Sequence, residues 1–153
     1  MRKQDYVSIE VAKLLQEKGF REPCKGTYLM EIKDEFTLNV NSSRETEFKD
    51  LSRIPSDGIQ LQYLAPTVYE ARDWIAQKCN TILLPDATWE YVDPDDMTNT
   101  EEVIRYSFMI FGEMHSEESY ETMGEALNAG ILYVLKDEDL WLRMELYCSE
   151  ERT

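Results

Sequence analysis

Apolar side chains recur at helical spacing in three segments of the chain, at residues 8–18, 68–78 and 123–136. Each segment carries polar side chains on the opposite face, which is typical of an amphipathic helix packed on a core. Ser8 is a suitable N-cap, and Gly19 fits the left-handed position that ends a helix. The side chains expected to face the core are Val7, Val11, Leu14, Leu15, Phe20, Val68, Ala71, Trp74, Ile75, Met123, Ala126, Leu127, Ile131, Val134 and Leu135.

The second and third helices open on the same sequence signature. Thr67 is followed three residues later by Glu70, and Thr122 is followed in the same way by Glu125. In such a capping box the threonine oxygen accepts a backbone N–H of the first turn, and the glutamate reaches back to the cap. Both helix starts are therefore predicted from local chemistry alone.

Alternating apolar and polar positions predict short strands between the helices. Pro85 and Asp86 are expected to form a turn, and residues 33–35 and 94–100 are expected to form loops. The predicted strands are residues 27–32, 36–40, 59–64, 81–84, 88–92 and 102–111. The core face of the last of these strands would carry Ile104, Tyr106, Phe108 and Ile110. We interpret residues 140–148 as a short helix, with a strand as the alternative.

The order of these elements predicts an α+β fold, in which an antiparallel-dominated sheet is packed by two or three amphipathic helices. A chain of 153 residues is long enough to bury a core, so we expect a single domain over residues 1–153. A subdivision is the alternative: an N-terminal helix plus hairpin in residues 1–50 and a core unit in residues 59–136, joined by the polar loop 41–58.

The charge of the chain is concentrated in its second part. Residues 1–53 hold ten basic and ten acidic residues, so the net charge of −15 lies entirely in residues 54–153. Neutralising phosphate needs cationic side chains that this region lacks, so direct binding to nucleic acid or to an anionic membrane is not expected. This charge is compatible with an acidic face that docks a basic partner or imitates a phosphate backbone, and also with a merely solubilising surface.

The expected compartment is the cytoplasm. No apolar run approaches the roughly 20 residues that span a bilayer, and the N-terminal residues lack the apolar segment of a secretory signal. Cys24, Cys79 and Cys148 are an odd number of cysteines without C-x-x-C spacing, so neither a disulfide framework nor a zinc site is predicted.

The chain lacks the common signatures of catalysis. It contains no glycine-rich phosphate loop, and His115, its only histidine, is expected to be a solvated loop residue whose pKa is raised by acidic neighbours. The spacing Asp93-x-Asp95-Asp96 resembles the start of a calcium loop, but the later ligand positions of that pattern do not hold carboxylates. We expect no cofactor, no metal and no enzymatic activity; a metal-dependent hydrolase using paired carboxylates is an alternative without supporting ligand spacing.

The aromatic content exceeds what the predicted apolar faces use. Trp89 and Tyr91 share one face of a short strand, and exposed aromatics with an acidic rim suit a protein interface. The same aromatics also suit a stacking pocket for a small ligand, or plain core packing. The candidate partner-binding residues are Trp89, Tyr91, Asp93, Asp95, Asp96, Glu117 and Glu118. The candidate ligand-binding residues of the alternative are Tyr69, Arg72, Arg105 and Trp141.

Three stretches, at residues 10–24, 65–75 and 122–131, carry a resemblance. Together they resemble a group of small uncharacterised proteins of gut Bacteroidales, their phages and their mobile elements. That group typically shows Ala-Pro-Thr-x-x-x-Ala-x-x-Trp-Leu followed by Thr-Tyr-Glu-Glu-Ala-Leu-Glu-Ala-Gly-Ile. The resemblance spans residues 8–136, and its motifs describe helix caps and helix faces, so it implies no chemistry. This chain departs from the group at Met123 and Gly124, where the group has Tyr and Glu.

One function and one alternative follow from these observations. The sequence favours a non-enzymatic, intracellular accessory protein whose acidic face docks a basic host protein, and the resemblance implies a phage or mobile-element type. The alternative is a protein that binds or sequesters a nucleotide-like small molecule in an aromatic pocket. A homo-oligomer is compatible with both.

Overall fold

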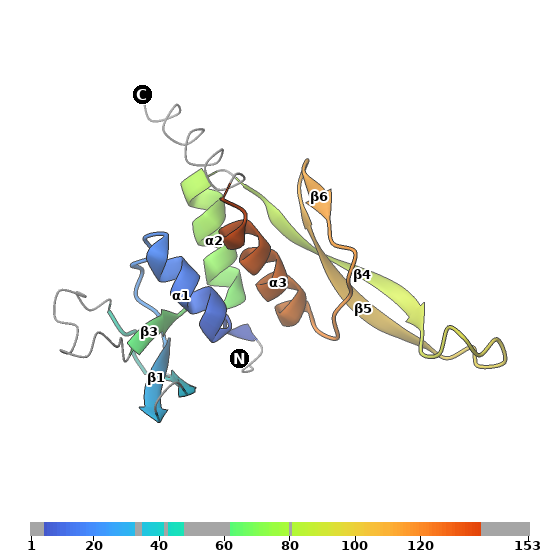
Figure 1. The fold of residues 1–153 in the computed structure, drawn as a ribbon, viewed down its shortest axis with the longest axis horizontal. Coiled ribbons are helices and arrows are strands. Elements are labelled where there is room, and N and C mark those ends of the chain that lie inside the picture. The colour runs from blue at the N-terminus through green and yellow to red at the C-terminus, as the bar shows by residue number, and fades with distance from the viewer. Residues whose placement is uncertain (1–4, 33–34, 42, 48–61, 80, 139–153) are drawn as a thin grey trace.

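The computed structural model describes residues 5–32, 35–41, 43–47, 62–79 and 81–138, and within them three helices lie between two small antiparallel sheets (Figure 1). The elements in chain order are α1 (Ile9–Glu17), β1 (Gly26–Ile32), β2 (Glu35–Val40), β3 (Gln62–Ala65), α2 (Val68–Cys79), β4 (Leu83–Tyr91), β5 (Glu102–Ile110), β6 (Met114–His115) and α3 (Met123–Lys136). The α+β class is confirmed. The strands form two sheets, ordered β2-β1-β3 and β4-β5-β6, and not the one sheet that the sequence predicted.

Helix α1 begins and ends as its sequence predicts. The Ser8 side chain accepts a hydrogen bond from the backbone N–H of Val11 at 3.3 Å. Gly19 has a φ of 100°, in the left-handed region that a glycine adopts without steric cost. The chain then folds back, so that the Phe20 N–H donates to the carbonyl of Leu15 and the Phe20 ring is buried. This C-terminal turn directs the chain from α1 towards β1.

The capping box of α2 is present, and at α3 the N-cap half of the predicted box is present. The Glu70 N–H donates to Thr67 Oγ1 at 3.1 Å, and the Thr67 N–H donates to Glu70 Oε1 at 3.0 Å. At α3, the Glu125 N–H donates to Thr122 Oγ1 at 3.1 Å. A cap of this kind contributes about 1 kcal/mol to helix stability, so both helix starts are fixed by neighbouring residues.

The core lies where the three helices meet and where they contact both sheets. Most of the predicted core positions are buried, and they form one cluster that draws on α1, α2, α3, β3, β4 and β5. Asn128 on α3 joins this arrangement to the start of α1, because its Oδ1 accepts the Ser8 N–H at 2.8 Å. Met123 was predicted to be buried and is exposed; it lines a surface hollow with Tyr69 and Tyr106, and Gly124 is buried instead.

The predicted turn at Pro85 and Asp86 is wrong, because β4 runs through both residues. The Phe111 N–H donates to the carbonyl of Ile82, and the Val92 N–H donates to the carbonyl of Glu101. Hydrogen-bonded pairs alternate along an antiparallel ladder, so every second residue from Ile82 points its backbone groups at β5. Pro85 lies between these positions on an edge strand, where its missing N–H costs the ladder nothing.

Several predictions fall wholly or partly outside the described residues. Most of the polar loop 41–58 is among them, as are residues 59–61 of a predicted strand and the terminal segment 140–148 with Trp141. Glu35, which was predicted to lie in a loop, is the first residue of β2. In the part of the chain that the structure describes, no helix is long and apolar enough to cross a bilayer.

Candidate functional site

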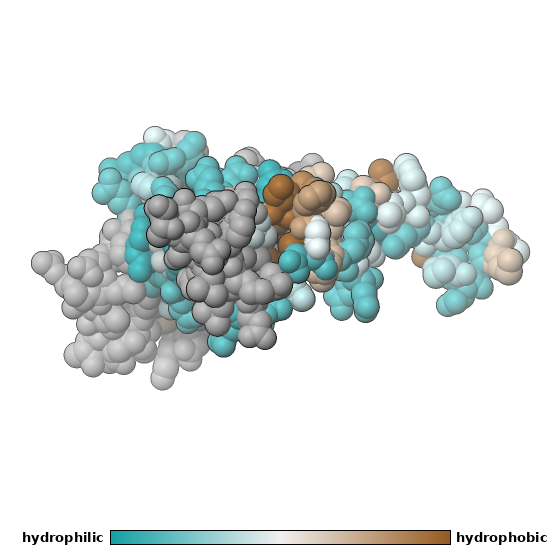
Figure 2. Space-filling view, turned by 90° about the horizontal axis from the view of Figure 1, so that it is seen from above, coloured by the Kyte–Doolittle hydropathy of each residue, from teal (hydrophilic) through white to brown (hydrophobic). Residues whose placement is uncertain are grey.

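Strands β4 and β5 form a long twisted hairpin that projects beyond the helices (Figure 1). We call its outer part, residues 86–105 with the tip loop 92–101, the arm. All residues from 86 to 98 are exposed, whereas Leu83, Phe108 and Ile110 at the base of the hairpin are buried. In Figure 2 the arm reaches the right end of the molecule with a mostly teal and pale surface, and the dense brown patch lies nearer the body. The hairpin is therefore anchored at one end and solvated at the other.

One face of the arm carries exposed aromatic side chains. Trp89 lies directly across from Ile104, and Tyr91 lies across from Glu102 two residues further along the same face. The exposed fractions of Trp89 and Tyr91 are 66% and 56%. The core face predicted for β5 is thus wrong at its outer end: Phe108 and Ile110 reach the core, but Ile104 is exposed because no helix covers the arm.

The acids of the tip loop divide into two kinds. Asp93 Oδ1 accepts the Asp95 N–H, and Asp96 Oδ1 accepts both the N–H and the hydroxyl of Thr98. These hydrogen bonds to Thr98 lower the pKa of Asp96. Asp93 and Asp96 therefore shape the loop. By contrast, none of the hydrogen bonds or ion pairs among the described residues uses the carboxylate of Asp95 or Glu102, so these two carboxylates are available to a partner.

The hairpin is strongly acidic. Residues 83–110 hold seven acidic residues and one basic residue, a net charge of −6. The basic residue, Arg105, was a candidate ligand-binding residue, but it braces the arm. Its Nη2 donates to the carbonyl of Ser119 at 3.1 Å, and its Nε lies 3.9 Å from Glu90 Oε2. These contacts hold β5 against the segment that precedes α3.

Glu117 and Glu118 lie away from the tip loop. Both are exposed, in the segment that follows β6. That segment runs beside the inner part of β5, since Ser116 Oγ accepts the Phe108 N–H and Tyr120 pairs with Tyr106. At about 3.3 Å per strand residue, roughly 15–20 Å of strand separates this level from the tip loop. The structure therefore brings Trp89, Tyr91 and the tip acids together but leaves the two glutamates outside that group.

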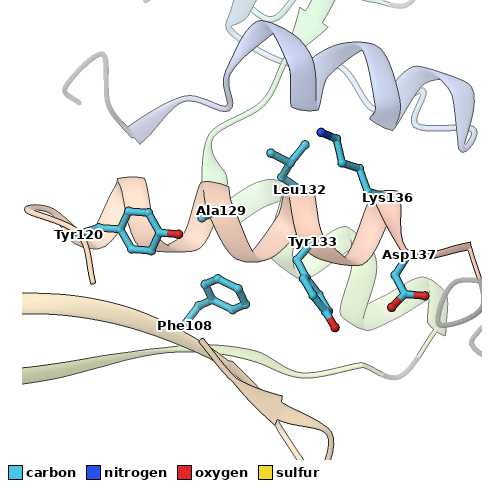
Figure 3. A pocket seen from close by; sticks show the side chains of 7 residues that line it. All are labelled: Phe108, Tyr120, Ala129, Leu132, Tyr133, Lys136 and Asp137. Atoms are coloured by element: carbon cyan, nitrogen blue, oxygen red, sulfur yellow. The ribbon is translucent and has the colours of Figure 1, made fainter. Parts of the chain in front are cut away.

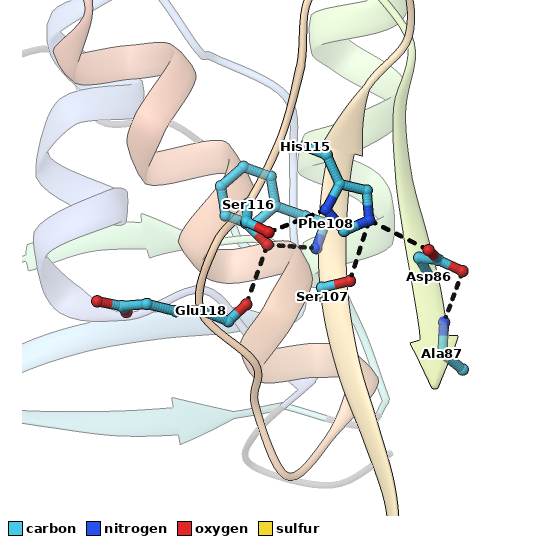
Figure 4. Close-up of polar contacts among 7 residues, drawn as sticks. All are labelled: Asp86, Ala87, Ser107, Phe108, His115, Ser116 and Glu118. Carbon is cyan, nitrogen blue, oxygen red and sulfur yellow. Dashed lines mark hydrogen bonds and ion pairs between the residues drawn. The ribbon is translucent and has the colours of Figure 1, made fainter. Parts of the chain in front are cut away.

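His115 forms a polar cluster at the base of the hairpin (Figure 4). Its Nε2 lies 3.1 Å from Asp86 Oδ2 and 3.4 Å from Ser107 Oγ, and its Nδ1 lies 2.9 Å from the carbonyl oxygen of Ser116. A carbonyl and a carboxylate only accept hydrogen bonds, so this geometry suits the doubly protonated ring. The hydrogen bond to Asp86 raises the pKa of His115 and lowers the pKa of Asp86. His115 was predicted to lie in a loop; it lies on β6, and the predicted direction of its pKa shift is confirmed.

The cluster has the residue types of a catalytic triad without its geometry. In a triad the carboxylate and the serine contact opposite nitrogens of the imidazole. Here Asp86 and Ser107 both lie at Nε2, and the carbonyl of Ser116 occupies Nδ1. Because Nε2 is directed at a carboxylate, it is not free to take a proton from Ser107. The cluster therefore links β4, β5 and β6 as a polar cross-link.

The titration of His115 gives a direct prediction. His115 is the only histidine, so its imidazole resonances in an NMR titration need no assignment by mutagenesis. We expect a midpoint above the ordinary value of about 6.5 in the wild type, and a lower midpoint in Asp86→Asn. The pair stabilises the fold between the ordinary carboxyl pKa and the ordinary imidazole pKa, and this contribution is lost as pH rises through the raised pKa of His115 or falls through the lowered pKa of Asp86. Identical midpoints in both proteins would contradict the pairing.

An apolar groove runs along the exposed side of α3 (Figure 3). Phe108, Tyr120 and Tyr133 line it together with Ala129 and Leu132, and its volume is about 460 Å³. A neighbouring hollow of about 700 Å³ shares Tyr120, Ala129 and Leu132 with it. The groove thus has an aromatic lining, although sequence analysis selected none of these residues as a binding residue, because they come from separate elements.

The residues predicted for a ligand pocket do not gather in this groove. Tyr69 and Arg72 lie one turn apart on α2, with the guanidinium 5.8 Å from the centre of the Tyr69 ring. Tyr69 lines the separate hollow that also contains Met123, and neither Arg72 nor Arg105 lines the α3 groove. Trp141 lies outside the described residues.

Among the described residues, no three histidine, cysteine, aspartate or glutamate side chains are grouped so that they could hold a metal ion. Cys24 is buried, and burial, reinforced by the carboxylates of Glu70 and Glu45, raises the pKa of its thiol to about 12. A thiol of this kind stays protonated at neutral pH, so it is unsuited to nucleophilic or ligand chemistry.

Sequence reasoning missed Glu102 and Ile104 as members of the arm surface. Ala87, Trp89 and Tyr91 alternate with Asp86, Thr88 and Glu90, which identifies residues 86–91 as one strand, but only the register with β5 shows that Glu102 and Ile104 lie across from it. The turn assigned to Pro85 concealed that this strand continues into the core. No family model, curated protein or solved structure matches this chain.

Proposed function

We propose that this protein is a non-enzymatic, intracellular accessory protein whose arm docks a basic host protein. The observation that carries the proposal is that one projecting hairpin combines exposed aromatic rings with carboxylates that bind none of the described residues, represented by Trp89, Tyr91, Asp95 and Glu102. The resemblance of three sequence stretches supports a phage or mobile-element type of accessory protein. The acidic arm is the part of the molecule that would meet the partner.

The physical chemistry of the arm favours a protein ligand. A two-stranded ribbon that exposes both faces is marginally stable in water, and it gains stability when a partner covers its apolar face. Tryptophan and tyrosine are enriched at the centres of protein interfaces. Lysine and arginine side chains suit this surface in particular, because they bind carboxylates and also stack on aromatic rings. A phosphate backbone would instead be repelled by the net charge of −6 on residues 83–110.

Reversing two free charges of the arm tests the proposal. The variant Asp95→Lys/Glu102→Lys leaves the loop hydrogen bonds of Asp93 and Asp96 in place. The control variant Glu17→Lys/Glu22→Lys makes the same change in net charge at exposed positions on the body. Each tagged protein is incubated with host lysate at low salt, and basic proteins retained by the wild type are then purified for affinity measurement.

We expect the arm variant to bind the purified partner at least about tenfold more weakly and with a smaller dependence on salt. The body variant should keep the wild-type affinity. Equal retention of the same proteins by both variants would show that general acidity, and not the arm, determines binding, and would reject the proposal.

The second candidate function is binding of a small planar ligand in the α3 groove. It is favoured by the convergence of Phe108, Tyr120 and Tyr133 on this groove (Figure 3). Lys136, the one cation of the lining, lies 2.6 Å from Glu10 Oε1 and is neutralised by it. The groove therefore suits an uncharged aromatic ligand better than a nucleotide. A ligand released by heat from the wild type, and absent from Tyr133→Ala, would support this function; its absence from both would reject it.

A further inference from the structure

The hydrogen-bond pattern between β4 and β5 shows which residues of β4 direct their backbone groups towards its outer edge. Ile82 and Val92 are hydrogen-bonded to β5 positions, and such pairs alternate, so Leu84, Asp86, Thr88 and Glu90 also direct their backbone groups at β5. The residues between them direct their N–H and C=O groups away from β5. These outward residues are Leu83, Pro85, Ala87, Trp89 and Tyr91.

The inner half of this edge is blocked, and the outer half is open. Pro85 has no N–H, and the Ala87 N–H donates to its neighbour Asp86 Oδ1 at 2.9 Å. Edge strands commonly carry such features, which oppose pairing with another strand. Trp89 and Tyr91 have no such protection: no hydrogen bond from their N–H groups to any described residue is present. Within the described part of the chain, the N–H groups of Trp89 and Tyr91 and the carbonyls of Ala87, Trp89 and Tyr91 are therefore available to a further strand.

The opposite edge of the arm is shorter. Tyr106 on β5 exchanges both backbone hydrogen bonds with Tyr120, and the carbonyl of Phe108 accepts the Ser116 N–H. Only Glu102 and Ile104 remain outward and unpaired on β5 among the described residues. The β4 edge also adjoins the aromatic face, because Trp89 and Tyr91 are themselves its open residues.

Charge decides which kind of strand fits this edge. If a second copy of β4 were added antiparallel in the register that pairs Ala87 with Trp89, Asp86 of each copy would face Glu90 of the other, and like charges directly opposite one another are destabilising. The two arms would also bring together two net charges of −6. A basic strand would instead place its cations beside Glu90, on the face of β4 opposite Trp89 and Tyr91.

We propose that residues 87–91 of β4 accept an extended basic segment of the partner as an added strand. This inference rests on the proposed function and specifies how the partner binds. The segment would alternate lysine or arginine with apolar residues, because neighbouring side chains of a strand lie on opposite faces. Backbone hydrogen bonds to Trp89 and Tyr91 supply affinity, and the side-chain alternation supplies specificity.

Synthetic peptides test the mode of binding with the full chain. The probe is an acetylated, fluorescent eight-residue peptide that alternates lysine and valine, and the control has the same composition with four lysines followed by four valines. Two further forms of the alternating peptide are N-methylated, one on its lysines and the other on its valines. Each form lacks the backbone hydrogen-bond donors along one of the two edges of the extended peptide. A ladder uses one edge only, so we expect fluorescence anisotropy to show one methylated form binding at least about tenfold more weakly than the other.

Protein variants provide the matched test. Trp89→Pro removes the outward N–H and the indole, whereas Trp89→Ala removes only the indole. Ile104→Pro and Ile104→Ala make the same comparison on the opposite edge. At position 89, we expect the proline variant to bind the alternating peptide at least about tenfold more weakly than the alanine variant. At position 104, we expect the proline and alanine variants to bind this peptide equally well. Circular dichroism of each variant checks that it is folded.

The outcomes separate the two proposals. Equal binding of the two methylated forms, together with equal affinities of the two variants at position 89, would overturn the added strand. If Asp95→Lys/Glu102→Lys still weakened binding in that case, docking of a basic partner through charge alone would stand. If neither the alternating nor the block peptide bound the wild type, the added strand would be overturned, and the proposed function would be decided by the lysate comparison of the two charge variants. Concentration-dependent self-association that Trp89→Pro abolishes would identify a second copy as the occupant and would also overturn the basic strand.

Discussion

Replacement of Phe108 by alanine is expected to lower the free energy of unfolding by about 3–5 kcal/mol. The ring is 4% exposed and lies at the point where the hairpin joins the body. It contacts α3 at Gly130 and lies 6.2 Å, centre to centre, from the ring of Tyr133. Removing it leaves a cavity between β5 and α3, where the ring packs near Gly130 and Tyr133. Urea unfolding followed by circular dichroism measures the change.

The matched control for this prediction is Ile104→Ala, on the same strand and the same face. Ile104 is exposed on the arm, so we expect its replacement to cost less than about 1 kcal/mol. Phe108→Leu keeps most of the apolar volume and should lie between the two. If Phe108→Ala and Ile104→Ala cost the same, the base of the hairpin would not be anchored as the structure describes.

The helices could be predicted from the sequence because their starts and ends depend on neighbouring residues. Thr67 and Glu70 satisfy one another within a single turn, and Ser8 and Gly19 mark the limits of α1 in the same local way. The interior of each helix then follows from the period of its apolar residues. The predicted burial of Met123 was wrong. Its burial depends on where the first turn of α3 lies relative to the core, which is a property of the whole fold.

The hairpin was harder to predict because a proline in a strand pattern can either end the strand or lie within an edge strand. At most positions Pro85 would end a strand, and only the register of β4 against β5 shows that its missing N–H faces away from the ladder. That register depends on contacts made by residues more than twenty positions away. The separation of the strands into two sheets is likewise set by long-range packing that no local pattern contains.

The candidate site was partly predictable for the same reason. The sequence identified Trp89, Tyr91 and the tip acids, since they adjoin one another along the chain. Glu117 and Glu118 were grouped with them on charge alone, and the structure places them beside another part of β5. Arg105 was assigned to ligand binding, whereas its contacts with Ser119 and Glu90 show a bracing role. Residue type indicated the chemistry, but only the fold determined which side chains share a surface.

Replacement of Gly130 by valine is the second large prediction, with an expected loss of about 2–3 kcal/mol. A Cβ at this position would lie 2.7 Å from Leu83 Cδ1 and 2.9 Å from Phe108 Cγ, and both of these side chains are buried. The higher helix propensity of valine offsets only about 0.5 kcal/mol of this overlap. The neighbouring Ala129→Val is the control, because Ala129 lines the open α3 groove, and it should cost less than about 1 kcal/mol.

Combining the two large replacements tests whether one contact explains both. In Phe108→Ala/Gly130→Val, the valine side chain can enter space that the missing ring leaves, so the loss should be smaller than the sum of the two single losses. We expect a coupling of about 0.5–3 kcal/mol, the range found for residues in direct contact. Additive losses would mean that Gly130 is constrained by Leu83 alone. A loss smaller than the sum would show that the close approach of α3 to Phe108 helps to hold the base of the hairpin on the body.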